Sequence, residues 1–347
     1  MNRASIFTAL LGLVIATMAR AEVYELPPEG YDVIGALSTV TARHEDTLVD
    51  IARRHGLGYE DVVRANPGVN IWLPGEGAEV ILPTRFVLPS VPRRGVVLNL
   101  AEYRMYYFPE PKDGEPAYVM TYPISIGRMD WETPLGLTKV ISKVRSPTWY
   151  PPESVREEHA ADGNPLPRIV PPGPDNPLGE YAMRLGLPGY LIHSTNRPAG
   201  VGMRVTHGCV RMFPEDIEYL FAQIGIDTPV RIINEPVKIG WNGDELVMEV
   251  HPVLETVLPE QSEAAAEAAE VVEGEEGAGA EVAVADVDFV GKDPLAYVIE
   301  QFVTVTSVRA GELDWHLAEE LVHRSDGVPT AVGQAIKNAA ASAAFQQ

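Results

Sequence analysis

Cysteine is nearly absent from this chain of 347 residues, which contains Cys209 and no other. A single cysteine has no partner for an intrachain disulfide, so a disulfide-stabilised scaffold is excluded. Positive charge is also scarce, since 27 Lys and Arg stand against 49 Asp and Glu, a formal net charge of -22. Such an excess of negative charge argues against a polyanionic partner such as nucleic acid.

Part of the acidity is concentrated in one stretch. Residues 258–290 contain ten Asp and Glu and no Lys or Arg, and residues 260–288 have no aromatic side chain. A stretch rich in Ala, Glu and Gly cannot bury enough apolar surface to fold alone, so 258–290 is predicted to be a linker. The whole chain is 46% hydrophobic and is long enough for two domains with appendages.

The first residues have the pattern of a secretory signal peptide. Asn2 and Arg3 give a short basic start, residues 6–17 are mostly apolar, and Ala-Arg-Ala at 19–21 fits a cleavage site. The apolar run is shorter than the roughly 20 residues that a membrane span needs. No cysteine follows the cleavage site to carry a lipid. Residues 1–21 are therefore predicted to direct export.

Cys209 lies close in sequence to two histidines, with His207 two places before it and His193 sixteen places before it. A thiol becomes a good nucleophile when a base removes its proton, and imidazole does this near neutral pH. Residues 190–193 alternate like a strand, which would hold the imidazole on a rigid element. Gly208 permits a sharp turn that leaves two N–H groups free as an oxyanion hole. The pattern indicates an activated cysteine.

Two other interpretations of Cys209 remain open. A lone cysteine is often a small buried hydrophobe, although a core cysteine has no need of His207 and Gly208 beside it. Alternatively, zinc could be held by His193, His207 and Cys209, which are all good ligands. The stretch has neither a CxxC nor an HxxxH spacing, so the pattern favours the nucleophile.

Residues 38–83 predict a compact β-α-α-β unit. Alternating residues at both ends indicate strands, and two short helices with turn residues between them fill the interval. Glu-Asp-Thr-Leu at 45–48, Asn-Pro at 66–67 and Leu-Pro-Gly at 73–75 give the unit a resemblance to LysM domains. The resemblance implies binding to N-acetylglucosamine-containing glycan, here peptidoglycan. The alternative is a small module that only packs on its neighbour.

The next region, 94–253, predicts a mainly-β domain. Short apolar strands such as 95–100 and 104–108 are separated by turn signals, which is typical of antiparallel sheets. Residues 147–188 contain ten prolines and little apolar periodicity. This favours a functional loop that forms a wall of a substrate cleft over a plain surface loop. Pro214 then begins a predicted helix.

The stretch from His193 to Arg211 resembles the signature of the L,D-transpeptidase catalytic (YkuD) domain. It has a strand-borne histidine, a spacer and then Thr-His-Gly-Cys. The flanking segments 171–178 and 234–239 resemble the proteobacterial branch of that family. The resemblance covers about residues 94–251 and implies a β-sandwich catalytic domain. It implies no cofactor and no metal.

The resemblance also assigns catalytic roles. It implies that Cys209 is the nucleophile, that His193 is its base, and that Ser194 orients the imidazole through its backbone carbonyl. It further implies that His207 supports the loop. The N–H groups of Gly208 and Cys209 would stabilise the tetrahedral oxyanion.

Substrate contacts are expected from Ser194, Thr206 and Arg211. Arg211 stands where the broad family often has Asn, although the proteobacterial branch tends to carry Arg there. A guanidinium at this position could bind a carboxylate of a peptidoglycan stem peptide with two parallel hydrogen bonds.

The implied reaction is acyl transfer in two steps. The thiolate attacks the bond after the third residue of a tetrapeptide stem, D-Ala leaves, and an amine resolves the thioester. The amine could belong to diaminopimelate of another stem or to a lysine of an outer-membrane lipoprotein, which places the reaction in the periplasm. A catalytically inactive peptidoglycan-binding protein and a cysteine peptidase that uses water remain the alternative functions.

The end of the chain, residues 291–347, predicts a helical appendage. Leu295, Val298 and Phe302 share helical spacing, as do Leu313 and Leu317. No motif in this part indicates a function.

Overall fold

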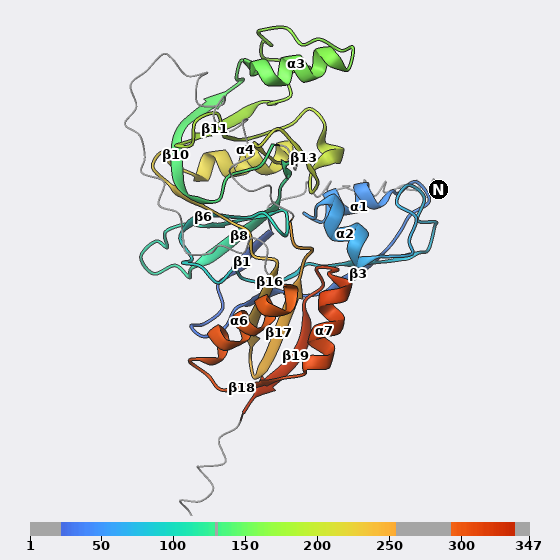
Figure 1. The fold of residues 1–347 in the computed structure, drawn as a ribbon, viewed down its shortest axis with the longest axis vertical. Coiled ribbons are helices and arrows are strands. Elements are labelled where there is room, and N and C mark those ends of the chain that lie inside the picture. Colours follow the sequence, from blue (N-terminus) through green and yellow to red (C-terminus); the bar gives the residue numbers. More distant parts are fainter. Residues whose placement is uncertain (1–21, 129–130, 255–292, 337–347) are drawn as a thin grey trace, which may run out of the picture.

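The computed structural model describes residues 22–128, 131–254 and 293–336. The predicted signal peptide (1–21) and the acidic linker (258–290) lie outside these ranges. The described elements pack around three hydrophobic cores (Figure 1). None of the described helices is both long and apolar enough to cross a membrane.

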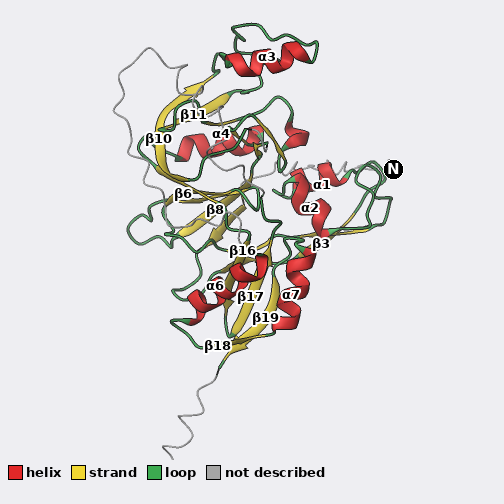
Figure 2. Ribbon diagram, in the orientation of Figure 1, coloured by secondary structure: helices red, strands yellow, loops and turns green. Residues whose placement is uncertain are grey.

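The largest element is a nine-stranded mixed sheet. In spatial order its strands are β1 (Glu22–Glu25), β8 (Tyr118–Pro123), β7 (Arg104–Phe108), β6 (Gly95–Asn99), β15 (Pro229–Ile233), β10 (Gly136–Arg145), β11 (Tyr181–Leu185), β12 (Leu191–His193) and β14 (Val210–Arg211). β10 pairs first with β15 and then with β11, with a register shift between Val140 and Ser142. The irregularity bends β10 so that the sheet curls (Figure 2). The mainly-β prediction is confirmed, but one curled sheet replaces the two separate sheets of a sandwich.

Helix α4 (Pro214–Gln223) lies inside the curled sheet, between β11 and β6 in Figure 2. It begins at Pro214 as predicted, because the fixed φ and the missing N–H of proline suit the first helical position. Ile217 and Leu220 are buried among apolar side chains from both halves of the sheet. This core holds the strands that carry the candidate site.

An N-terminal unit consists of β3 (Ser38–Thr41), α1 (Leu48–Arg54), α2 (Tyr59–Ala65) and β4 (Glu79–Leu82), with β3 and β4 antiparallel. The β-α-α-β order predicted for 38–83 is therefore confirmed. Thr47 precedes α1 and forms a capping box, in which the Thr47 hydroxyl accepts the Asp50 N–H and the Asp50 carboxylate accepts the Thr47 N–H. A second strand pair, β2 (Val33–Gly35) and β5 (Arg85–Val87), adjoins the unit.

The N-terminal unit packs on the face of the central sheet opposite α4. Along β7, Met105 and Tyr107 belong to the core around α4, whereas Tyr106 and Phe108 belong to the core shared with α1 and α2. Successive side chains of a strand point to opposite faces, so one strand serves both cores.

The C-terminal part corrects the predicted helical appendage. It contains α6 (Pro294–Thr306) and α7 (Trp315–Arg324), but also β18 (Gly311–Leu313) and β19 (Thr330–Ala335). These strands join β16 (Val237–Asn242) and β17 (Glu245–Val250) in a separate four-stranded sheet. β19 buries Val332 on an otherwise partly exposed strand, so its sequence shows little apolar alternation.

Candidate active site

Two neighbouring parallel strands bring the predicted nucleophile and base into the same part of the molecule. β12 ends at His193, and β14 begins directly after Cys209. The register pairs Ile192 with Val210 and His193 with Arg211. Cys209 therefore lies two residues before the partner of His193, at the end of the curled sheet formed by β12 and β14.

His193 is buried and held in one tautomer. Its Nδ1 lies 2.6 Å from the carbonyl oxygen of Ser194. Because a carbonyl only accepts, Nδ1 carries the proton and Nε2 keeps the lone pair that a base needs. Burial and then the charge of Arg211 lower the pKa of His193 to about 3, against the carbonyls of Ser194 and Leu178. The imidazole is therefore neutral at physiological pH.

The Cys209 thiol is also neutral at rest. It is half-buried, and its Sγ donates to the carbonyl oxygen of Gly189 at 3.6 Å. Burial raises its pKa to about 11, although the backbone of Leu191 and the charge of Arg211 act in the opposite direction. Since the thiol has so little thiolate character by itself, a base must remove its proton.

Two hydroxyl groups fix the backbone on either side of Cys209. Thr206 Oγ1 donates to the carbonyl of Cys209 at 2.6 Å, and Thr133 Oγ1 donates to the carbonyl of Gly208 at 2.7 Å. Gly208 has a φ of +93°, and a Cβ there would lie 2.9 Å from the ring of Tyr190. Glycine is therefore required at 208 by both backbone conformation and space.

His207 connects this loop to the proline-rich segment. Its Nε2 donates to Glu158 Oε2 at 2.8 Å, and its ring meets Trp131 edge-to-face at a centroid distance of 5.0 Å. Glu158 belongs to α3 (Glu153–Ala161) and also accepts from Arg128 at 2.7 Å. Burial lowers the pKa of His207 despite the hydrogen bond from its ring to Glu158. The segment 147–188, predicted as a structureless wall, contains α3 and β11.

Arg211, which pairs with His193 across the two strands, has an unmet hydrogen-bond donor. Its Nε is buried and has no hydrogen-bond partner among the described residues, and burial lowers its pKa. Ser194 and Thr206 are also buried, and the Thr206 hydroxyl already donates to the Cys209 carbonyl. The Arg211 Nε–H is therefore a donor that a substrate carboxylate could use.

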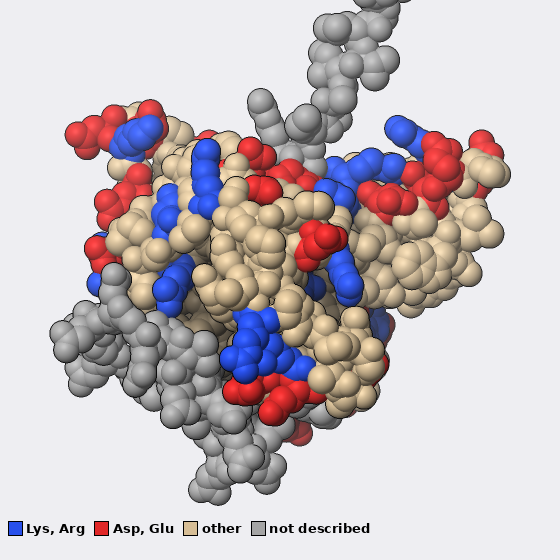
Figure 3. Space-filling view, turned by 90° about the horizontal axis from the view of Figure 1, so that it is seen from above, with Lys and Arg blue, Asp and Glu red and all other residues tan. Residues whose placement is uncertain are grey.

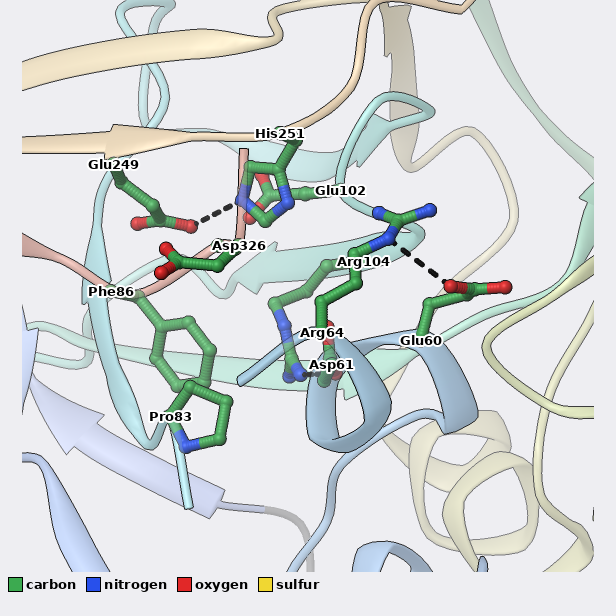
Figure 4. Close-up of a pocket in the computed structure, with 11 residues that line it drawn as sticks. Glu60, Asp61, Arg64, Pro83, Phe86, Glu102, Arg104, Glu249, His251 and Asp326 are labelled. Atoms are coloured by element: carbon green, nitrogen blue, oxygen red, sulfur yellow. Dashed lines mark hydrogen bonds and ion pairs between the residues drawn. The ribbon is translucent and has the colours of Figure 1, made fainter. Parts of the chain in front are cut away.

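Among the described residues, His193, His207 and Cys209 are not a group whose ligand atoms converge as a zinc site requires. The described residues that could converge on a metal are Glu102, Glu249 and His251, far along the sequence from Cys209. They line a different pocket, together with Glu60, Asp61 and Arg64 of α2 (Figure 4). Lys238 already fills the centre of this group, with its Nζ 2.7 Å from Glu102 and 3.0 Å from Glu249.

Sequence reasoning missed Thr133, Glu158 and the Gly189 carbonyl. Each lies in a turn or in the proline-rich segment, and each contact joins residues at least 20 positions apart. Thr133 precedes Pro134, a pattern that indicates a turn but no contact with Gly208. The surface on the α3 side gives no further guidance, since Figure 3 shows small mixed groups of both charge signs there.

Comparison with known proteins gives one consistent family. The model of the L,D-transpeptidase catalytic domain (YkuD) matches residues 93–232. "Probable L,D-transpeptidase ErfK/SrfK" of Escherichia coli is 39% identical over 258 residues, which cover 73% of this chain and 82% of that protein. "Probable L,D-transpeptidase YcfS" of the same species is 40% identical over 255 residues, covering 72% and 78%.

Solved structures show weaker similarity. The catalytic domain from the Enterococcus faecium L,D-transpeptidase aligns over 42% of this chain and 100% of that chain. Its identity is 23% and its TM-score is 0.31.

Proposed function

Because this chain belongs to the YkuD family of L,D-transpeptidases and is a peptidoglycan L,D-transpeptidase, we propose that Cys209 is its nucleophile and His193 its base. The observation that carries the proposal is the neutral imidazole of His193, whose Nδ1 is committed to the Ser194 carbonyl on the strand beside Cys209. The remaining nitrogen, Nε2, is the one able to accept a proton.

The first step forms a thioester. As the thiol leaves the Gly189 carbonyl, His193 takes its proton and the sulfur attacks the carbonyl carbon of the third residue of a tetrapeptide stem. The N–H groups of Gly208 and Cys209 stabilise the oxyanion, a contribution of roughly 3–4 kcal/mol per donor in other enzymes. The imidazolium then protonates the leaving amine of D-Ala, and the carbon–nitrogen bond breaks.

The second step returns the enzyme to its starting state. His193 takes a proton from the acceptor amine, the amine attacks the thioester carbonyl, and the carbon–sulfur bond breaks as the sulfur regains its proton. The acceptor is either the side amine of diaminopimelate in another stem or a lysine of an outer-membrane lipoprotein. Incubation of sacculi with purified protein, with and without a lysine-bearing lipoprotein, distinguishes these products by mass spectrometry.

We further propose that Arg211 binds a carboxylate of the stem peptide. Its unmet Nε–H and its position beside His193 support this role. The planar guanidinium can form two parallel hydrogen bonds that lysine cannot reproduce. Arg211→Lys should therefore raise the KM for the donor stem, whereas unchanged transfer kinetics would remove the role.

The N-terminal unit is proposed to be a LysM domain that binds peptidoglycan glycan strands. Its β-α-α-β topology supports this, as do the exposed side chains of Trp72 and Leu73. The turn is ordered because Asn70 Oδ1 accepts both of their N–H groups. Trp72→Ala should weaken sedimentation with sacculi, whereas Tyr150→Ala, an exposed aromatic in the proline-rich segment, should not.

Export to the periplasm follows from the signal pattern of residues 1–21 and remains part of the proposal. A fusion of residues 1–30 to a reporter that is active only after export should be active, and its Arg3→Glu variant should lose much of that activity. Cytoplasmic retention of the unaltered fusion would contradict export.

The two alternative functions have different products. A catalytically inactive wall-binding protein releases no D-Ala from tetrapeptide muropeptides. A cysteine peptidase gives hydrolysed stems with no crosslinked or lipoprotein-linked product. The proposed enzyme gives D-Ala and an amide-linked product, both lost in Cys209→Ala while glycan binding persists.

A further inference from the structure

A single hydroxyl joins the catalytic loop to a neighbouring strand. Thr133 lies in the turn before β10 and is buried. Its Oγ1 accepts the N–H of Gly127 at 3.2 Å and donates to the carbonyl of Gly208 at 2.7 Å. Gly127 belongs to β9 (Ile126–Gly127), which pairs with β13 (Arg204–Thr206), the strand that leads into the catalytic loop.

The peptide unit between Gly208 and Cys209 is the one that this hydroxyl orients. In a trans peptide the C=O and the N–H point in opposite directions. Fixing the Gly208 carbonyl toward Thr133 therefore aims the Cys209 N–H away from Thr133. Gly208 has the backbone freedom of a residue without Cβ and a φ of +93°, so this plane needs an external contact to hold one direction.

A second hydroxyl holds the next peptide. Thr206 Oγ1 donates to the Cys209 carbonyl at 2.6 Å. The two peptide units that flank the nucleophile are thus fixed by two threonines, one on the strand before the loop and one from a distant turn. Thr206 belongs to the signature that the sequence displays, whereas Thr133 lies outside it.

We propose that Thr133 is a positioning residue that directs the Cys209 N–H at the developing oxyanion. This rests on the proposed function of Cys209 as the nucleophile. Thr133 touches neither the thiol nor the imidazole, so its effect passes through the Gly208–Cys209 peptide. It therefore acts on the transition state more than on substrate binding.

The test compares Thr133→Val with Thr133→Ser and with a matched control. Valine keeps the shape of threonine but has no hydroxyl, and serine restores it. Thr138→Val is the control because the Thr138 hydroxyl is also buried but has no hydrogen-bond partner among the described residues. The measurements are kcat and KM for D-Ala release from a tetrapeptide muropeptide, the rate of Cys209 alkylation by iodoacetamide, and Tm.

Thr133→Val is expected to lower kcat about 10²-fold, the lower end of the loss of one oxyanion donor. KM should stay within about twofold, and the alkylation rate should not change, because alkylation forms no oxyanion. Thr133→Ser should recover most of kcat, and Thr138→Val should resemble the unaltered enzyme. Should Thr133→Val unfold, Thr133→Ala measured below its Tm replaces it.

Three results would overturn the positioning role. These are a kcat for Thr133→Val equal to that of Thr138→Val, a failure of Thr133→Ser to recover activity, and an equal loss of alkylation and transfer. The proposed function is tested separately by the unaltered enzyme and Cys209→Ala. If the unaltered enzyme releases no D-Ala, the nucleophile assignment fails whatever Thr133 does.

Discussion

In the described part of the chain, two of the buried groups of titratable side chains respond to burial in opposite ways. At the end of the sheet formed by β12 and β14, burial keeps His193 and Cys209 uncharged, with pKa values of about 3 and 11. At the pocket beside α2, Lys238 forms ion pairs with Glu102 and Glu249, all three side chains being buried; Figure 4 shows the two carboxylates. Burial opposes ionisation at both places. Paired opposite charges outweigh it at the second place, whereas at the first the charge of Arg211 does not offset the effect of burial on Cys209.

The buried ion cluster joins the three parts of the described chain. Lys238 comes from β16 and contacts Glu102, which lies between β6 and β7 of the central sheet. Beside it, Arg104 of β7 pairs with Asp61 of α2 at 2.5 Å and covers the ring of Phe86. The N-terminal unit, the curled sheet and the C-terminal sheet therefore meet at one set of paired charges.

The two groups are suited to different roles: the uncharged side chains to proton transfer, and the ion pairs to holding the parts of the fold together. Burial opposes ionisation of Glu249, but Lys238, the hydrogen bond from His251 and the N–H of Val87 hold its pKa at about 2. Burial likewise opposes the charge of Lys238, and Glu102 and Glu249 raise its pKa. Glu249 and Lys238 therefore both stay charged throughout the physiological pH range. His193 and Cys209, the proposed catalytic pair, form no ion pair with each other and stay neutral, which suits the proposed transfer of a proton from sulfur to nitrogen when substrate arrives.

The largest expected effect is the loss of D-Ala release when Cys209 or His193 is replaced. Cys209→Ala and His193→Gln should each reduce D-Ala release roughly 10⁴-fold or more, because they act as one unit. Neither breaks an ion pair, so Tm should change little. The rate of D-Ala release checks this, with His316→Gln, an exposed histidine on α7, as the control. Retained activity in His193→Gln would show that another group is the base.

The next largest effect is the loss of stability when the buried ion pairs of Lys238 are broken. Lys238→Met leaves Glu102 and Glu249 buried without their cation and should lower the free energy of unfolding by about 3–5 kcal/mol. The matched change Lys139→Met removes an exposed pair with Asp227, 2.6 Å apart, and should cost less than about 1 kcal/mol. Urea unfolding measures both. Equal losses would mean that burial does not distinguish the two pairs.

A neutral catalytic pair predicts a particular pH dependence of thiol alkylation. With the pKa of Cys209 raised to about 11, the iodoacetamide rate should keep rising toward pH 10. A thiolate–imidazolium pair would instead give a plateau around neutrality. A plateau between pH 5 and 8 in the unaltered enzyme, lost in His193→Gln, would contradict the neutral pair.

The same burial affects stability in acid. The pKa of His193 is lowered from 6.5 to about 3 in the folded protein. As the pH falls from 6.5 toward 3, the unfolded chain binds a proton at this position that the folded chain does not, so stability decreases over this window. In His193→Gln the free energy of unfolding, measured with urea, should fall less steeply between pH 6.5 and 3. An unchanged dependence on pH would argue against a buried neutral imidazole.

The smallest effect is expected at a partly exposed ion pair between the N-terminal unit and helix α4 inside the curled sheet. Arg53 of α1 pairs with Glu215 of α4 at 2.7 Å, with side chains 40% and 27% exposed. Arg53→Ala should cost less than about 1 kcal/mol, and the cost should shrink in high salt. A loss as large as that of Lys238→Met would mean that solvent does not screen this pair.

The sequence predicted the parts of the site that are local. His193 and Cys209 stand in one signature, α4 starts at Pro214, and the β-α-α-β order follows from apolar periodicity and turn residues. These features depend on neighbours within a few positions, where pattern and structure are directly linked.

The parts that could not be predicted depend on contacts between distant segments. Glu158 reaches His207 across 49 positions, and Thr133 reaches Gly208 across 75. A polar residue in a turn gives no sign of its partner. The pairing of β17 with β19 was missed for the same reason, since nearly 80 residues separate the two strands.

The most direct test of the account is the mass of the acylated enzyme. Purified protein is incubated with a tetrapeptide muropeptide without acceptor amine, quenched in acid and analysed as intact protein and as proteolytic peptides. The account predicts a thioester adduct, equal to the donor less D-Ala, on the peptide that contains Cys209 and absent from Cys209→Ala. D-Ala release that continues in Cys209→Ala, or an adduct on any other residue, would contradict it.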